Sequence, residues 1–314
     1  MKVRLIFNPS SGRPRRNAPI LPMLRHFVAS MPLDADLVCT EGPGHATEIA
    51  REAVAAGCQR IVAVGGDGTV NEVAQALIHT PATLGLVPCG SGNGLALHLG
   101  LPRTFSRALE LAAGPGGRAV EIDTGTVNGR PFVNAMGLGL DADVACRFNR
   151  LTRRGLPAYT RTALSAFLGR KSEHCTVAVA GRRERVEILL IAVANSDQYG
   201  NNAKIAPHAR VDDGVLDLVI IRPVGVVAAC FLGARLFLGS IDRSSRVRRM
   251  RGANFQIERP APGLIHTDWE THSDGATIGV AVLPRSLRII VPPDCAAAVH
   301  AADLAADGFA LQLP

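Results

Sequence analysis

The stretch that most constrains the fold is an apolar run that ends in a glycine-rich turn. Residues 61–64 read Ile-Val-Ala-Val, residues 65–69 read Gly-Gly-Asp-Gly-Thr, and helical spacing follows over Val70–Ile78. A strand that enters a helix through such a turn predicts a parallel α/β unit. Glycines lack a Cβ and can take positive φ angles, so a ligand can approach this main chain closely.

The same turn predicts a phosphate-binding site. Free N–H groups at the start of a helix attract anions, and Thr69 is placed to cap the helix or to bind a phosphate oxygen. Asp67 would repel phosphate unless a cation or a proton in transfer stands between them, which favours phosphoryl transfer over passive binding. The alternative is a turn whose glycines serve geometry alone. The density of glycines favours phosphate binding.

Strands and helices alternate through the first hundred residues, which predicts an open, largely parallel sheet. Strands are expected at 3–7, 34–40 and 84–87 besides the central one, and helices at 20–31 and 46–56. Asn8, Thr40 and the first glycine turn would then meet at the carboxyl ends of the strands, where such sheets bind ligands. A second glycine loop, Pro-Cys-Gly-Ser-Gly-Asn-Gly-Leu-Ala at 88–96, would form a second wall of the pocket.

From about residue 121 the pattern changes to short β-rich runs, which predict an antiparallel sandwich or barrel. The runs are 120–127, 131–135, 176–180, 186–194, 216–221, 255–258 and 287–291. We therefore expect a nucleotide-binding α/β domain over 1–125 and a β-rich substrate domain over 126–292. The tail, 293–314, has helical composition at its start and is expected to pack back on the first domain.

Charge and cysteine usage narrow the function classes. The net charge is +7, and lysine occurs only at positions 2, 171 and 204, so 31 of the 34 basic residues are arginine. This favours phosphate-bearing partners, either a nucleotide or an anionic membrane. The densest basic run, 243–251, is more simply a solvated face than a lipid contact. The seven cysteines are scattered without a C-x-x-C pair, which indicates a reducing compartment.

The sequence predicts neither a signal peptide nor a transmembrane helix. The apolar run at the N-terminus is too short for a signal peptide. The best candidate for a membrane span, Val215–Gly239, is interrupted by three charged residues and a proline. We therefore expect a cytoplasmic protein.

Five motifs, in order along the chain, resemble the diacylglycerol kinase catalytic family, which includes bacterial soluble lipid kinases and sphingosine kinases. They are Asn-Pro-Ser-Ser-Gly at 8–12, Gly-Gly-Asp-Gly-Thr-Val-Asn-Glu at 65–72, Pro-Cys-Gly-Ser-Gly-Asn at 88–93, Asp-Thr-Gly-Thr-Val-Asn-Gly at 123–129, and the segment 194–217. The resemblance implies a first domain like those of NAD kinase and phosphofructokinase, with a parallel sheet. It also implies a mostly antiparallel β-sandwich second domain and an active site in the cleft between the two.

The resemblance also implies roles for individual residues. Nucleotide contacts would fall on Asn8, Thr40, Gly65, Gly66, Asp67, Gly68, Thr69, Asn71, Gly90, Ser91 and Asn93. The late Asp-Gly-Glu motif of the family appears as Asp268-Trp269-Glu270, with the only tryptophan of the chain in place of glycine. Glu270 aligns with the catalytic base, and Asp67 is its rival for that role or an organiser of magnesium.

A structural magnesium site is implied on the loop at 210–215. By position it would use the carboxylate of Asp213 with the main-chain carbonyls of Arg210 and Val215, which suits a hard cation. A tight Asp-Asp-Gly turn without a metal is the alternative. The histidines at 45, 98, 208 and 266 lack metal-ligand spacing and are expected to be structural.

The implied activity is transfer of the γ-phosphoryl of ATP, with Mg²⁺, to a lipid hydroxyl of the diacylglycerol or sphingosine type. Two other classes stay open: a kinase for a soluble substrate, such as NAD, and a catalytically inactive lipid- or nucleotide-binding protein. The expected partners are ATP, a lipid acceptor and an anionic membrane bound peripherally. No nucleic acid is expected, and a homodimer is left open. The arginines at 243, 246, 248, 249 and 251 are candidates for holding the protein at a bilayer.

Overall fold

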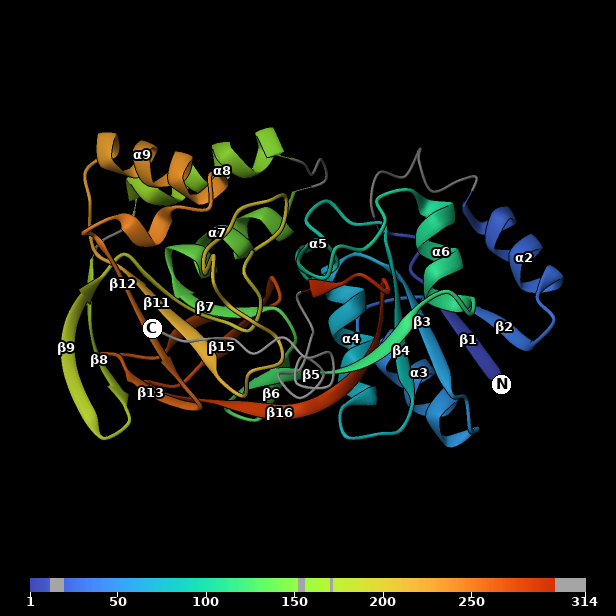
Figure 1. Cartoon of the computed structure of the whole chain (residues 1–314). Coiled ribbons are helices and arrows are strands. Elements are labelled where there is room, and N and C mark those ends of the chain that lie inside the picture. The colour runs from blue at the N-terminus through green and yellow to red at the C-terminus, as the bar shows by residue number, and fades with distance from the viewer. Residues whose placement is uncertain (12–19, 152–155, 170–171, 297–314) are drawn as a thin grey trace.

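The computed structural model describes residues 1–11, 20–151, 156–169 and 172–296, and its described strands form two sheets (Figure 1). The α/β architecture of the first part and the antiparallel sandwich of the second confirm the predicted fold class. The predicted domain boundary at residue 125 falls inside a strand, β5 (Arg118–Val127), and stays a prediction.

The first part is a parallel sheet covered by helices on both faces. Its elements are β1 (Lys2–Phe7), α2 (Ile20–Ser30), β2 (Asp34–Cys39), α3 (His45–Ala55), β3 (Arg60–Gly65), α4 (Asp67–Leu77), β4 (Thr83–Pro88), α5 (Gly94–His98) and α6 (Phe105–Ala113). The strand order is β2-β1-β3-β4, all parallel. Helices α3 and α4 bury one face of the sheet and α2 and α6 the other, so β3 is apolar without alternation.

The second part is a sandwich of two sheets, and its described residues also form three α-helices and a 3₁₀ helix. Its elements are β5, β6 (Arg130–Phe132), β7 (Ala135–Gly139), α7 (Leu140–Asn149), α8 (Leu156–Gly169), β8 (Glu173–Val179), β9 (Arg182–Ile188), β10 (Leu190–Ala194), β11 (Leu216–Ile221), α9 (Val226–Phe237), a short 3₁₀ helix (Ile241–Arg243), β12 (Val247–Gly252), β13 (Asn254–Glu258), β14 (Gly263–Thr267), β15 (Glu270–Asp274) and β16 (Thr277–Val291). One sheet is antiparallel throughout, in the order β12-β11-β10-β7-β14-β15. Side chains from both sheets form the core between them.

The long strand β16 joins the two parts. It pairs in parallel with β4 and antiparallel with β5 and β13, so the sheet of the first part continues into the sandwich. Figure 1 shows β5 and β16 crossing from one part to the other. This shared frame places the glycine loops of the first part against the β14–β15 hairpin of the second.

Several local expectations differ from the structure. The run 186–194 was expected as one strand, but Leu189 marks the change from β9 to β10, which lie in different sheets. The run 131–135 divides in the same way between β6 and β7. Helices α7, α8 and α9 were not among the expected elements. Cys295 is buried in the core of the first part, and residues 297–314 of the predicted tail lie outside the described residues.

Candidate active site

The first glycine turn packs against the loop after β1. Asn8 Nδ2 donates a hydrogen bond to Thr69 Oγ1 (2.9 Å), and the N–H of Gly66 donates to Ser11 Oγ (3.2 Å). Helix α4 begins at Asp67 rather than at residue 70, and Gly66 is its N-cap residue. The buried Thr69 therefore holds the first loop and does not cap the helix, contrary to one of its two expected roles. Ser11 was missed as a site residue, although the Asn-Pro-Ser-Ser-Gly motif contains it.

The glycines of the turn are required by close packing. A Cβ on Gly65 would stand 2.5 Å from Thr69 Oγ1, and a Cβ on Gly66 would stand 3.2 Å from the Cα of Gly90. Neither Gly65 nor Gly66 uses the positive φ that glycine allows, so their role here rests on the missing Cβ. The two glycine loops instead lie main chain against main chain.

Asp67 ties the second glycine loop to the first. Its two carboxylate oxygens accept the N–H groups of Asn93 and Gly94, each at 2.8 Å. The Asn93 side chain brackets Gly90, because it accepts from the Gly90 N–H and donates to the Gly90 carbonyl, both at 2.9 Å. Burial raises the pKa of Asp67 to about 6, and the two amides act against that rise.

The remaining nucleotide candidates lie around these loops. Thr40 follows β2, and its N–H donates to the Phe7 carbonyl (2.8 Å), which places it at the carboxyl end of the sheet beside β1. Ser91 is exposed on the second loop. Glu72 is structural: its carboxylate accepts the N–H groups of Gly44 (2.9 Å) and Ala46 (3.1 Å) at the start of α3.

The β14–β15 hairpin reaches this site from the second part. Asp268 and Trp269 form its two-residue turn, with φ angles of 47° and 73°. The buried carboxylate of Asp268 accepts the Nδ2 group of Asn71 (2.6 Å) and three N–H groups, of Val133 (2.8 Å), Asn134 (2.9 Å) and Ala135 (2.9 Å). Asn71 therefore joins the two parts through this contact. Asp268 was missed as a site residue, although it belongs to the same Asp-Trp-Glu motif as Glu270.

Trp269 takes a backbone conformation that favours glycine, and its ring packing explains why a bulky residue is tolerated there. The indole Nε1–H donates to the Tyr199 carbonyl (2.9 Å). The ring stacks on His266 with a centroid distance of 5.2 Å and an interplanar angle of 3°, and it meets the Tyr199 ring edge-on. The left-handed conformation costs on the order of 1 kcal/mol, which these contacts offset.

Glu270, the first residue of β15, lies at the glycine turn. Its Oε1 atom is 3.3 Å from the place that a Cβ on Gly68 would occupy. Burial, followed by repulsion from Glu72 and Asp268, raises the pKa of Glu270 to about 7. A carboxylate with a pKa near neutrality, placed at a candidate phosphate site, has the properties of a general base.

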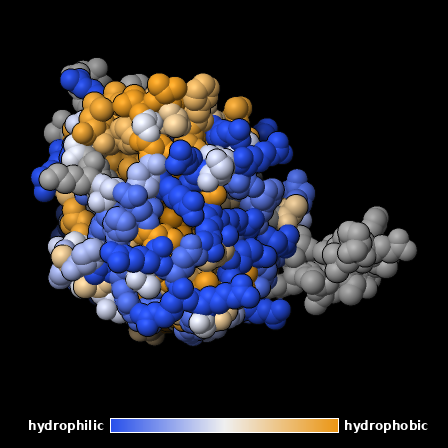
Figure 2. All heavy atoms as spheres, turned by 90° about the vertical axis from the view of Figure 1, so that its left-hand side faces the viewer, coloured by the Kyte–Doolittle hydropathy of each residue, from blue (hydrophilic) through white to orange (hydrophobic). Residues whose placement is uncertain are grey.

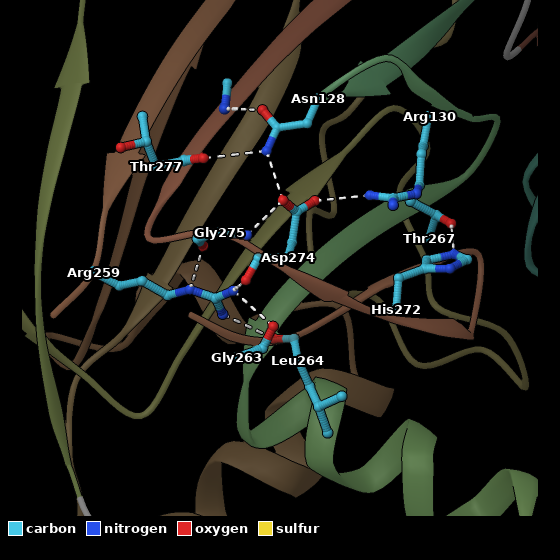
Figure 3. A network of polar contacts seen from close by, with 11 residues as sticks. Asn128, Arg130, Arg259, Gly263, Leu264, Thr267, His272, Asp274, Gly275 and Thr277 are labelled. Atoms are coloured by element: carbon cyan, nitrogen blue, oxygen red, sulfur yellow. Dashed lines mark hydrogen bonds and ion pairs between the residues drawn. The ribbon is translucent and has the colours of Figure 1, made fainter. Parts of the chain in front are cut away.

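A polar network fixes the far end of the same hairpin (Figure 3). Asp274 accepts from Asn128 Nδ2 and from Arg130 Nη1, each at 2.9 Å. The Arg259 guanidinium donates to four main-chain carbonyls, of Gly263, Leu264, Asp274 and Gly275. With Asp268 held at one end and Asp274 at the other, the strand that carries Glu270 is anchored on both sides.

Ion pairs engage the carboxylates of the predicted metal loop. Arg251 donates to the carboxylate of Asp213, which neutralises its charge, and Arg210 pairs with Asp212. Within the described ranges, no group of three histidine, cysteine or acidic side chains could hold a metal ion. The metal site on Arg210, Asp213 and Val215 thus stays a prediction of the sequence.

Ion pairs also engage the histidines and the basic run. His98 Nδ1 lies 2.8 Å from Asp197 Oδ1, and His266 Nε2 lies 3.3 Å from Asp141 Oδ2, so both have structural contacts. Of the five arginines in the run, three lie on β12 and pair with acidic residues: Arg248 with Glu184, Arg249 with Asp217, and Arg251 with Asp213. The run therefore does not present five unpaired charges to a membrane.

Comparisons with known proteins identify the family of this chain. Residues 2–127 match the diacylglycerol kinase catalytic domain, and residues 134–291 match the YegS C-terminal NAD kinase beta sandwich-like domain. A "probable lipid kinase YegS-like" of Pseudomonas fluorescens is 31% identical over 266 residues, which cover 83% of this chain and 87% of the relative. A "diacylglycerol kinase" of Bacillus subtilis is 32% identical over 228 residues, 70% of this chain and 74% of the relative.

Solved structures share the fold. A diacylglycerol kinase of Bacillus anthracis superposes with a TM-score of 0.70 at 23% identity, over 94% of this chain and 98% of that one. An NAD kinase of Archaeoglobus fulgidus in complex with ATP reaches a TM-score of 0.52 at 14% identity, over 93% and 94% of the two chains. No helix among the described residues is long and apolar enough to span a membrane. By its two matched domains and its relatives, the chain belongs to the lipid kinase family of YegS and diacylglycerol kinase.

Proposed function

We propose that this protein transfers the γ-phosphoryl group of ATP to a lipid hydroxyl, with Mg²⁺ arriving as part of the Mg·ATP co-substrate. The observation that carries the proposal is the placement of Glu270, from the second part of the chain, against Gly68 in the first glycine turn. The N–H groups at the start of α4 are suited to hold phosphate oxygens. The loops that bear Asn8, Thr40 and Ser91 line the same edge.

In this proposal Glu270 is the general base. Its carboxylate takes the proton of the acceptor hydroxyl as the hydroxyl oxygen bonds to the γ-phosphorus. The bond from that phosphorus to the bridging oxygen breaks, and ADP leaves with the electron pair. Asp67 is a positioning residue, since both of its carboxylate oxygens already accept amides of the second loop. Magnesium on the triphosphate would offset the negative charge of Asp67, Asp268 and Glu270.

The acceptor is proposed to be a membrane lipid, so the enzyme would act at a bilayer surface, from the cytoplasm. Support comes from the family, whose relatives carry the names lipid kinase and diacylglycerol kinase. A diacylglycerol, a sphingoid base and phosphatidylglycerol each present a hydroxyl on an apolar body, and each is a candidate.

A substrate screen tests the proposal. Purified protein and Mg·ATP are incubated with each candidate lipid in mixed micelles and, separately, with NAD, and phosphorylated products are detected by mass spectrometry. We expect phosphorylation of at least one lipid, and a rate about 10²- to 10⁴-fold lower for Glu270→Gln. Glu258→Gln, in an exposed ion pair with Arg183, should keep the wild-type rate. Phosphorylation of NAD alone, or of nothing, would overturn the proposal.

A further inference from the structure

Helix α9 carries apolar side chains on its solvent-facing side. Val227, Phe231 and Leu238, at its C-cap, are 71%, 68% and 78% exposed. Spacings of four and seven residues place them on one face of the helix. Leu232 is the only buried residue of α9. A surface helix ordinarily exposes polar residues to water, whereas this face of α9 exposes apolar ones.

Helix α8 extends the apolar surface. Leu164 and Leu168, one helical turn apart, are 51% and 66% exposed. Both helices lie at the same end of the second part, above the antiparallel sheet (Figure 1). Figure 2 shows a hydrophobic area at that end of the molecule. Large contiguous apolar areas of this kind mark interaction sites. We call the five side chains Leu164, Leu168, Val227, Phe231 and Leu238 the apolar face.

The two helices that carry the apolar face contain basic but no acidic residues. The described residues 144–151 and 156–169, which include α8, contain three arginines and no aspartate or glutamate. Residues 218–241, which include α9, contain two arginines and again no acidic residue. Exposed apolar side chains on helices that are basic and free of acidic residues complement an anionic lipid surface, which offers hydrocarbon beneath a layer of negative charge.

The apolar face is connected to the candidate active site through one short segment. The N–H of Lys204 donates to the Leu236 carbonyl in α9 (2.9 Å), and the N–H of Asn201 donates to the Gly92 carbonyl in the second glycine loop (3.0 Å). The segment 201–204 therefore connects α9, which bears part of the apolar face, to the second glycine loop of the candidate active site.

We propose that the apolar face docks the protein on an anionic bilayer, with side chains of α8 and α9 inserted at the level of the lipid headgroups. The docking deepens the proposed function and rests on it only for the identity of the acceptor. It replaces the arginine run as the main membrane contact, because the three arginines of that run on β12 already pair with acidic residues of β9, β11 and the loop before β11.

Vesicle binding tests this surface. The probe is a vesicle of equal parts phosphatidylcholine and phosphatidylglycerol, and bound protein is measured by co-sedimentation. The triple variant Val227→Ser, Phe231→Ser, Leu238→Ser should bind at least about tenfold more weakly than wild type. Met23→Ser, an exposed apolar residue on α2, is the matched control and should bind like wild type. Higher salt should weaken wild-type binding, since basic residues contribute.

A second variant serves if the triple variant does not fold. Phe231→Trp keeps the apolar character and adds a second tryptophan to Trp269. Lipids with brominated chains should quench the fluorescence of this added tryptophan. Quenching no greater than that of wild type would contradict insertion. Wild type that does not bind, or a folded triple variant that binds equally well, would overturn the proposal. The proposal would also be overturned if wild type is a dimer in sedimentation velocity and the triple variant is a monomer, because a second copy would then cover the apolar face.

The same variants separate this proposal from the kinase proposal. On a short-chain, dispersed acceptor the triple variant should keep the wild-type rate while losing activity on vesicles. Vesicle binding that depends on the apolar face, in a protein that phosphorylates no lipid, would retain the docking surface and reject the kinase function.

Discussion

Replacing Glu270 by glutamine should make the protein more stable at pH 8 while removing its activity. The carboxylate is held where water is partly excluded and where Glu72 and Asp268 repel it. A glutamine of the same shape carries no charge and avoids both penalties. An increase of stability on removal of a charge is the mark of a group that the fold keeps for chemistry.

The size of the effect follows from the pKa. Glu270 has a pKa of about 7 in the folded protein, against 4.5 for an ordinary glutamate. At about 1.4 kcal/mol per pKa unit the difference corresponds to an upper limit of about 3 kcal/mol, and partial exposure of the side chain reduces the expectation to about 1–2 kcal/mol.

The raised pKa of Glu270 also determines whether the stability of the protein rises or falls with pH. Because the folded state holds the proton more tightly, the stabilising contribution of protonated Glu270 is complete below pH 4.5. It is lost as the pH rises to about 7, and little changes above that value.

Urea unfolding at pH 5 and pH 8 measures this difference. The midpoint of Glu270→Gln should exceed that of wild type at pH 8, and the gap should shrink at pH 5, with an unchanged dependence on urea. Glu258→Gln, in its exposed ion pair, should show no such gap. Equal midpoints of wild type and Glu270→Gln at pH 8, or a less stable variant, would refute the reasoning about burial and repulsion.

Three further predictions concern the surrounding structure. Trp269→Gly relieves the strain of the left-handed backbone but removes the ring contacts with His266 and Tyr199. Thermal unfolding should therefore show that the variant loses about 2 kcal/mol of stability. A gain of stability would mean that the ring does not anchor the hairpin. Gly66→Val forces the two glycine loops apart, so calorimetry should show ATP affinity at least about tenfold lower; unchanged affinity in a folded variant contradicts a nucleotide site there. Mg²⁺ without nucleotide should leave the melting temperature unchanged, because Arg251 neutralises Asp213; a rise that Asp213→Asn abolishes would establish the cation site instead.

The sequence predicts the first half of the site well, because its determinants are local. The strand before residue 65, the glycines and the following helix are contiguous, and parallel topology brings Asn8 and Thr40 to the same edge. Glu270 was identified through a family motif. Its contact with Gly68 depends on β16, which continues the parallel sheet of the first part into antiparallel strands of the second in a way that no local pattern shows.

What the sequence does not predict depends on distant partners. Asp268 shows its role only through Asn71, 197 positions away, and through three main-chain amides. The presence of Trp269 at a position that favours glycine is explained only by its ring contacts with Tyr199 and His266. Helix α9 escaped prediction because periodicity arguments assume that apolar residues face inward, and on this helix they face solvent.

The measurement that tests the central claim most directly is the pH dependence of kcat/KM for Mg·ATP, which reports the free enzyme. With the preferred lipid from the substrate screen, wild type should show a rate that rises with pH and levels off above an apparent pKa near 7, and Glu270→Gln should lack both the rate and the rise. A flat profile through this range, or a Glu270→Gln variant with the wild-type rate and profile, would contradict the assignment of Glu270 as the base that joins the two parts of the chain in one active site.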